Sequence, residues 1–453
     1  MSNGGGARKS ITSGLLLIAL GVILLLYRFE PGLHIGHIIR FYWPLLLVFW
    51  GIAKIADHFV ARRSQDGRPS PVTAGEVVLL LFAIFLLGAY GFHDWLHSKY
   101  PDMDIEFGPF SQHYTLNKEM PSQAIPAGAH VILKTGRGNI TVHTGSENTL
   151  SVTANMSARG TTESNADDSM NQVPVVVEKS GDGYTVHPVN QNNSDAQVSV
   201  DLDVEVPKSV SITANSDRGD ISIAGISGVV AASTQKGNFD IHDSGSDVNV
   251  DMQSGDARIS DIAGNVHITG HGNEIEVADV TGNATLEGDF YGPVHLRNIT
   301  KTTRYATNRD TLTVVNMTGR LELDSDSIQV SDVMGAANLV THNRDLEVEN
   351  VAGRLDIVDT HTSVTVRCSE APKQDLNITN DSGSVDLTLP SSSSFEVAAT
   401  SRGGEIDNDF ETSSLKAVNE PDTGKLSGKY GSQQGPKITI NTSYGTISLH
   451  KSS

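Results

Sequence analysis

The sequence is poor in cysteine, and Cys368 is the single one among 453 residues. One thiol cannot form an internal disulfide, and the chain has no CxxC pair or zinc-ligand spacing. We expect Cys368 to be a semi-buried thiol in a strand. A chain of this size without disulfides is unusual for an animal extracellular module but ordinary for a bacterial envelope protein.

Basic residues are also scarce, and the formal net charge is −20. Residues 1–96 hold eight Lys/Arg and five Asp/Glu, which leaves 25 and 48 in residues 97–453, a balance of −23. So acidic a segment repels nucleic acid and anionic lipid, which excludes both as partners. Divalent cations, bound weakly, and basic polymers remain compatible with it.

The common catalytic motifs are absent as well. The sequence has no Gly-x-Ser-x-Gly, no P-loop and no Rossmann fingerprint. His34 and His37 form an isolated HxxH pair, which is a weak metal signal without a third ligand. We predict no catalytic residue, no cofactor and no metal site, and therefore a non-enzymatic protein.

Three apolar runs are present near the N-terminus, at 11–29, 41–59 and 74–92. Each is about as long as a helix that crosses the hydrocarbon core of a bilayer. The first run is too long for a cleavable signal peptide and continues into a second span. The sequence thus predicts a three-helix membrane anchor over residues 1–95.

Basic residues predict the orientation of this anchor. Arg8 and Lys9 precede the first run, and Arg62, Arg63 and Arg68 lie between the second and third. The positive-inside rule then puts the N-terminus and the 60–73 loop in the cytoplasm, and three crossings put the C-terminal part outside the cytoplasmic membrane.

Aromatic residues support this orientation. Trp43 and Trp95 fall at the predicted outer interface, where amphipathic rings are enriched. Pro44 falls in the first turn of its helix, where the missing N–H costs nothing.

Residues 14–21 (GLLLIALG) and 41–51 (FYWPLLLVFWG) carry a recognisable pattern. It resembles the transmembrane region of LiaI/LiaF-type cell-envelope stress proteins, over about residues 11–59. The resemblance implies a sensing or regulatory role. The predicted cytoplasmic parts are short, so a signal would have to pass through a partner bound to the helices.

From about residue 210 the sequence repeats. Each unit is an alternating strand, an Asp or Asn, an apolar residue, a spacer and usually Gly, as in 257–264 (ARISDIAG) and 275–282 (IEVADVTG). The closing positions step by 16 to 19 residues, with one double step where Lys301 replaces Gly. The repeated corner residues are Asp261, Gly264, Asp279, Gly282, Asn316, Gly319, Asp332, Gly335, Asn350 and Gly353.

A short fixed period in alternating sequence predicts an all-β solenoid, similar to a parallel β-helix, with a repeat of about 18 residues. Gly at the corner is expected to supply a turn with unusual dihedrals, and Asp or Asn to cap backbone groups. Some fifteen coils at ~4.8 Å each would extend over roughly 70 Å.

The segments 136–142 (GRGNITV), 217–223 (DRGDISI), 383–390 (GSVDLTLP) and 438–449 (ITINTSYGTISL) strengthen this prediction. They resemble phrases of a bacterial adhesin-like family of β-strand-repeat domains of unknown function, over about 125–450. The resemblance implies a parallel β-helix-like fold and no established activity.

Domain boundaries follow. We predict a juxtamembrane tether at 96–124 and a β-solenoid at 125–453, with a polar insertion at about 160–195. The polar stretches 160–172, 189–195 and 419–436 are predicted loops.

The solenoid could carry chemistry, because β-helical lyases and hydrolases cluster carboxylates on neighbouring coils. The candidate row is Asp243, Asp261, Asp279, Asn298, Asn316, Asp332 and Asn350. Its members occupy equivalent positions, which favours a structural ladder over an active site or a calcium site. His267, His271 and His295 sit in adjacent repeats, and we expect His267 and His295 to point outward without forming a joint site.

The prediction is therefore a membrane-anchored, extracytoplasmic, adhesin-like binding or scaffold protein of the bacterial cell envelope. Its expected partners are the lipid bilayer and envelope proteins or cell-wall polymer. The alternatives are a β-helical carbohydrate-active enzyme and a purely structural spacer.

Overall fold

The computed structural model describes residues 112–145, 148–160, 162–181, 183–189, 191 and 198–452. All of them belong to one unit, Gly108–Ser453. The three predicted helices and the interface residues Trp43, Pro44 and Trp95 lie outside the described residues.

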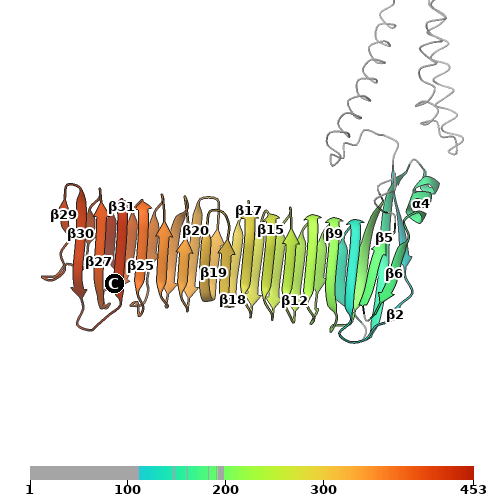
Figure 1. Cartoon of the computed structure of the whole chain (residues 1–453), viewed down its shortest axis with the longest axis horizontal. Helices are drawn as coiled ribbons and strands as arrows, with labels where there is room; N and C mark the ends of the chain where they lie inside the picture. Colours follow the sequence, from blue (N-terminus) through green and yellow to red (C-terminus); the bar gives the residue numbers. More distant parts are fainter. Residues whose placement is uncertain are drawn as a thin grey trace, which may run out of the picture. The chain divides into compact units, whose positions relative to one another are not determined.

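The described chain is mostly β, and its strands stand side by side in one long row (Figure 1). Each regular layer contributes one strand to each of two faces, which we call sheet I and sheet II. Neighbouring layers pair in parallel with an offset of 18 residues, as Ala257 with Ile275 in sheet I and Val248 with Val266 in sheet II. The predicted repeat and its largely parallel arrangement are confirmed.

Hydrogen-bonded neighbours define the order of strands in each sheet. Sheet I runs β1 (Gln112–Glu119), β5 (Thr149–Gly160), β8 (Ser199–Val206), β4 (Ile140–Thr144), β10 (Ile221–Ala224), β12 (Phe239–Ser244), β14 (Ala257–Ile262), β16 (Ile275–Val280), β18 (Val294–Ala306), β19 (Thr311–Leu323), β20 (Ser327–Val333), β22 (Asp345–Val351), β24 (Val364–Arg367), β26 (Val385–Pro390), β32 (Ile447–Ser452) and β28 (Ile406–Asn408). Sheet II runs β6 (Val175–Ser180), β7 (Gly183–Pro188), β3 (His130–Arg137), β9 (Ser211–Arg218), β11 (Val230–Lys236), β13 (Val248–Met252), β15 (Val266–Gly272), β17 (Ala284–Phe290), then β18 and β19 again, β21 (Ala337–Val340), β23 (Leu355–Asp359), β25 (Leu376–Ser382), β31 (Lys437–Tyr444), β27 (Phe395–Arg402), β30 (Thr423–Tyr430) and β29 (Val418–Glu420). The two-residue β2 (Gln123–Ala124) pairs with β5.

The core lies between the two sheets and consists of Val, Ile and Leu from alternate strand positions. In β14 the buried positions are Ala257, Ile259 and then Ile262, so the alternation shifts by one at the end of the strand. We call the end where sheet I leads into sheet II edge A, as at 243–247, and the opposite end edge B, as at 253–256. The shift lets an inward side chain follow the chain around edge A.

Between the first coil, β3–β4, and the last coil, β31–β32, one layer runs in reverse. The 13-residue strands β18 and β19 each run through both sheets, and β19 is antiparallel to β18, β20 and β21. The chain turns back at 307–310 in sheet II and at 324–326 in sheet I, and neither turn crosses edge B. The sequence did not predict this reversed layer, and the double step at Lys301 marks its position.

Both ends of the stack are closed by excursions of the chain. The first coil, β3–β4, lies between β7–β8 and β9–β10, and the last coil, β31–β32, lies between β25–β26 and β27–β28. At the C-terminal end Phe395, Phe410 and Tyr430 form an aromatic cluster, with the Phe410 and Tyr430 ring centroids 4.8 Å apart. This cluster covers the apolar interior of the last layers.

Three predicted boundaries need correction. The predicted tether, 96–124, ends in β1 and β2, and β1 pairs with β5 over eight residues. The predicted loop 160–172, within the polar insertion, contains helix α4 (Glu163–Asn171), whose N-terminus is capped by Thr162 and which buries Ala166 and Met170. The predicted loop 419–436 contains β30, an antiparallel partner of β27. The polar composition of these segments wrongly indicated loops. The segments cover the two ends of the strand stack, and a few apolar residues are enough for that contact.

The intercalated last coil generates a prediction. Removing residues 437–453 deletes the strands on which β27 and β28 stack, so the C-terminal cap should detach and become protease-sensitive. Replacing 391–436 by a short Gly/Ser linker removes a longer stretch but leaves β31–β32 stacked on β25–β26. Limited proteolysis with mass spectrometry should find the second variant more resistant; equal sensitivity of the two would contradict the observed strand order.

Candidate functional site

The predicted row of Asp and Asn residues lies along edge A. Asp243, Asp261, Asp279, Asn298, Asn316, Asp332 and Asn350 all have left-handed backbone conformations, with φ between 51° and 58°. Asp and Asn tolerate this conformation better than other non-glycine residues. The left-handed residue shifts the alternation of buried and exposed side chains by one position, and the chain turns there from sheet I into sheet II. The row of Asp and Asn residues therefore has a conformational role.

The expectation for the corner glycines was wrong. Gly264, Gly282, Gly319, Gly335 and Gly353 do not have positive φ. A Cβ at each of them would instead collide with the backbone of a neighbouring layer, for example with Gly264 O at position 282 and with Gly335 O at position 353. Glycine is required here for close approach of layers, and the unusual dihedrals belong to the Asp and Asn residues.

Side-chain hydrogen bonds join the layers at edge A. Asn298 Nδ2 donates to Asp279 Oδ1 at 2.6 Å, and Asn350 Nδ2 donates to Asp332 Oδ1 at 3.1 Å. Asn265 and Asn283 extend a second ladder, in which the backbone N–H and Nδ2 of Asn283 both donate to Asn265 Oδ1 at 2.9 Å. These side-chain amides and carboxylates are thus used in hydrogen bonds between neighbouring layers.

A further ladder, at edge B, was missed by sequence reasoning. The Oδ1 atoms of Asn139, Asp220, Asn238 and Asp256 each accept the backbone N–H of the next layer, at 2.7 to 3.2 Å. A Gly directly precedes each of these residues, and the last three pairs are 18 residues apart. This 18-residue spacing of Gly-Asx pairs could have predicted the edge B ladder from the sequence.

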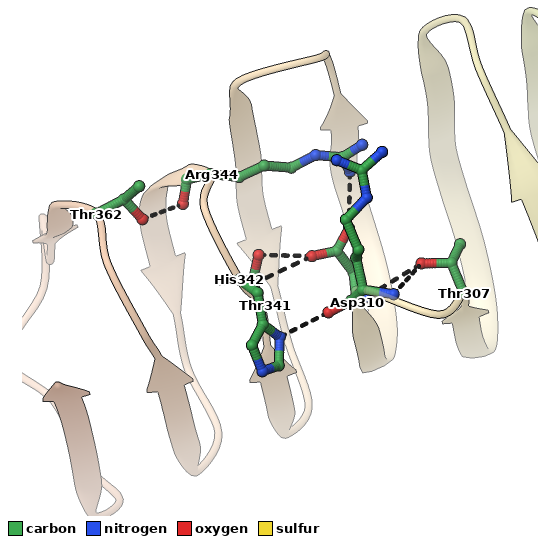
Figure 2. Close-up of polar contacts among 7 residues, drawn as sticks. Thr307, Asp310, Thr341, His342, Arg344 and Thr362 are labelled. Carbon is green, nitrogen blue, oxygen red and sulfur yellow. Dashed lines mark hydrogen bonds and ion pairs between the residues drawn. The ribbon is translucent and has the colours of Figure 1, made fainter. Parts of the chain in front are cut away.

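A buried ion pair lies at the reversed layer, where the turn at 307–310 leaves edge B uncrossed (Figure 2). Arg344 Nη1 is 2.9 Å from Asp310 Oδ2, and their side chains are 10% and 1% exposed. The two atoms do not make a well-oriented hydrogen bond, so the contact is an ion pair. Thr341 Oγ1 donates to Asp310 Oδ1 at 2.7 Å.

Other buried polar groups surround this pair. Tyr305 is 1% exposed, and burial raises the pKa of its hydroxyl, which Arg344 partly opposes. Asp359 is also 1% exposed; burial raises the pKa of its carboxyl, although Thr362 donates to Oδ2 through Oγ1 at 3.0 Å. Thr362 Oγ1 also reaches Arg344 O at 2.6 Å (Figure 2). Side chains thus close the edge where no backbone crosses from one sheet to the other.

Charged residues on the outer face of sheet I form ion pairs across layers. Arg258 Nε is 2.9 Å from Glu276, and Arg297 lies 4.0 Å from the same carboxylate. Arg320 lies 3.6 Å from Glu322 within the same strand, β19. Exposed pairs of this kind add little stability each, but they fix opposite charges in register along the sheet.

A shallow depression opens on sheet I beside the reversed layer. It is lined by Ser327, Gln329, Asp345, Leu346, Glu347, Ser363 and Thr365. Asp345 Oδ1 accepts the Ser363 N–H at 3.0 Å, and Glu347 pairs with Arg367. Both carboxylates are therefore engaged in structural contacts.

Histidines do not converge on a metal site. His267 and His271 lie in β15 of sheet II, whereas His295 lies in β18 on sheet I. His271 Nε2 is 3.9 Å from Asp289, and His295 Nδ1 is 3.9 Å from Glu322. Within residues 112–452, leaving out their short gaps, no group of three or more His, Cys, Asp or Glu could hold a metal ion.

The ion pair at the reversed layer generates a prediction. Arg344→Met leaves Asp310 charged and buried, which should cost about 3–5 kcal/mol of stability. Asp310→Asn combined with Arg344→Met removes both charges and keeps an acceptor for Thr341, so it should cost less than Arg344→Met alone. The measurement is the chemical unfolding of the full chain in detergent, followed by far-UV circular dichroism.

The matched control is the exposed pair Arg354–Asp356, at 2.7 Å with side chains 61% and 32% exposed. Arg354→Met should change stability by less than about 1 kcal/mol. An effect of Arg344→Met no larger than this control would show that edge B does not depend on the buried pair.

Two family models match the chain. The model described as Toastrack DUF4097 matches residues 129–450, and the model of the LiaF transmembrane domain matches residues 12–97. The second match includes the third apolar run, which the resemblance over 11–59 left outside the unit. The chain is therefore membrane-anchored through its N-terminal region. In the part of the chain that the structure describes, no helix is long and apolar enough to span a membrane.

Three solved structures of low similarity each cover about three quarters of this chain. A protein named for cell adhesion from Clostridium sporogenes is 10% identical, covering 74% of this chain and 100% of its own, with a TM-score of 0.16. One named as an adhesin from Bacteroides fragilis is 10% identical, covering 74% and 97%, with a TM-score of 0.22. One named for lipid binding from Parabacteroides distasonis is 11% identical, covering 75% and 97%, with a TM-score of 0.20.

Scores this low support no conclusion about this chain, and a search of curated proteins found no match. The two family models cover most of the sequence, and the larger one spans nearly all of the stacked strands. The chain belongs to the DUF4097 toastrack family, with a LiaF-type transmembrane domain at its N-terminus.

Proposed function

We propose that this protein is a non-enzymatic, extracytoplasmic scaffold of the bacterial cell envelope. Its three-helix anchor holds the solenoid outside the cytoplasmic membrane, where the solenoid surface, including its edges, binds envelope components in an adhesin-like manner. A sensing role through partners of the anchor is compatible with the LiaF-type domain.

One observation carries the proposal: equivalent polar groups recur in register from layer to layer, and the row from Asp243 to Asn350 extends over six steps, or about 29 Å. In the ladders at both edges and in the ion pairs on sheet I, carboxylates of one layer contact groups of the next layer, and these contacts repeat along the stack. A repeated surface of this kind suits binding to an extended partner, because every layer offers a similar set of groups.

The acidic balance of residues 97–453 favours the same environment. A charge of −23 keeps the solenoid soluble and disfavours contact with nucleic acid or anionic lipid headgroups. The LiaF match over residues 12–97 supplies the membrane attachment.

Thiol labelling tests the placement. Cys368 is 8% exposed, and burial raises the pKa of its thiol to about 11, so the native protein should not react with maleimide at neutral pH. Ser432→Cys adds an exposed thiol in the solenoid, and Ser64→Cys adds one in the predicted cytoplasmic loop. In intact spheroplasts a membrane-impermeant maleimide should label Ser432→Cys alone, and both variants after detergent lysis.

The reverse labelling pattern would refute the extracytoplasmic placement. A photo-crosslinking maleimide on Ser432→Cys and on exposed Gln253→Cys tests binding in the same cells. Light-dependent adducts with envelope components are expected; their absence at both positions, with labelling intact, would refute the binding role.

A further inference from the structure

Exposed aromatic side chains are rare in the described part of the chain. Most of its Phe and Tyr rings are buried or half-buried, but Tyr291 and Tyr444 are 77% and 69% exposed. Exposing a large apolar ring forgoes the stabilisation that its burial would give, so such rings often mark contact sites.

The two tyrosines lie on the same edge of the solenoid. Tyr291 directly follows β17, and Tyr444 is the last residue of β31, and both strands belong to sheet II. The intervening pairings contain two antiparallel steps, at β18–β19 and β19–β21, so β17 and β31 run in the same direction. Both rings therefore project from edge B, six layers or about 29 Å apart along the stack.

Tyr291 breaks the repeat. Phe290 pairs with Gly272, the Tyr291 N–H donates to Gly272 O at 2.9 Å, and the Gly292 N–H donates to Asn273 O at 3.1 Å. Because Val294 pairs with Ile275, the three residues 291–293 stand opposite only two residues of the preceding layer, 273 and 274. This insertion lengthens the step from β16 to β18 to 19 residues, against 18 from β14 to β16. The Tyr291 backbone stays paired with the preceding layer, but its ring is 77% exposed and lies outside the stack, which indicates a role at the surface.

Hydrogen-bonding groups accompany Tyr291. Asn308 Nδ2 lies 3.3 Å from both carboxylate oxygens of Asp289, and His271 Nε2 lies 3.9 Å from Asp289 Oδ2. These three side chains come from three successive layers at edge B and are partly exposed. They offer amide, carboxylate and imidazole groups beside an aromatic ring.

Tyr444 lies beside a glycine of the neighbouring layer. Gly403, in the next layer, has a φ of 77°, and a Cβ there would come within 3.3 Å of Tyr444 Cδ1. The left-handed glycine leaves room for the ring on its neighbour. Two exposed rings on the same edge offer two stacking platforms.

We propose that edge B, with Tyr291 and Tyr444, binds a neutral polysaccharide chain that lies along the solenoid. A sugar ring presents an apolar C–H face to an aromatic ring and hydroxyl groups to amides and carboxylates. The charge of the region disfavours a polyanion such as nucleic acid. This inference deepens the proposed function, since an envelope glycan is met only outside the cytoplasmic membrane.

Calorimetry on the full-length protein in detergent tests the inference, with chitohexaose and cellohexaose as probes. At least one hexamer should bind. Tyr291→Ala and Tyr444→Ala should each weaken binding about fivefold, the loss of one stacking contact. The double variant should lose binding, and Tyr→Phe at both positions should retain most of it.

The matched control is Met334→Ala, which removes a side chain 59% exposed at edge A. It should leave affinity unchanged, and circular dichroism should be native for every variant. Failure of wild-type protein to bind either hexamer, equal binding by the double variant, or tyrosine-dependent binding of a polyproline peptide in place of the glycans would overturn the inference. Because it uses purified protein, this outcome is separable from the labelling in spheroplasts.

Discussion

Backbone pairing between layers is the constraint on which the rest of this structure depends. A single two-strand coil cannot bury its apolar face or satisfy its strand edges, so each coil is stable only between neighbours. Because neighbouring coils pair through their strands, the turns that connect the strands lie as close together as the strands do. Three features make this close approach of the turns possible. Glycine at the corners avoids a Cβ clash, a left-handed Asp or Asn before it turns the chain, and side-chain oxygens accept the N–H groups of the next layer.

The reversed layer shows what happens where this pattern is interrupted. β19 runs backward, two hairpins replace a crossing of edge B, and the interior is closed there by Tyr305, Asp310 and Arg344. A buried ion pair is an expensive closure, because both charges lose hydration. The pair sits where no backbone segment is available to cover the core, and the one-residue insertion at 291–293 precedes it by one layer. The irregular features in the middle of the stack thus gather around the reversed layer.

Much of the regular fold could be predicted from the sequence. The alternation of β14 and β16 with their Asp, apolar residue and Gly predicted the period, the parallel stacking and the edge row, because these depend on short local patterns. The reversal could not be predicted, since Asn316 and Gly319 keep the same local pattern although β19 runs the other way. The intercalation of β31–β32 and the pairing of Asp310 with Arg344 depend on contacts distant in sequence. The polar sequences of α4 and β30 predicted loops. Both elements have few apolar residues, because they only cover the ends of the stack.

Deleting whole and partial coils tests the central claim, that identical steps of backbone pairing hold the solenoid together. Removing residues 238–255 takes out one 18-residue repeat and joins Gly237 to Asp256, so β11 can stack on β15 and β10 on β14. Removing only 238–246 takes out half a repeat and destroys the register. Circular dichroism and protease resistance of the full-length chain should be retained after the first deletion and lost after the second. Equal tolerance or equal collapse of the two variants would contradict the account.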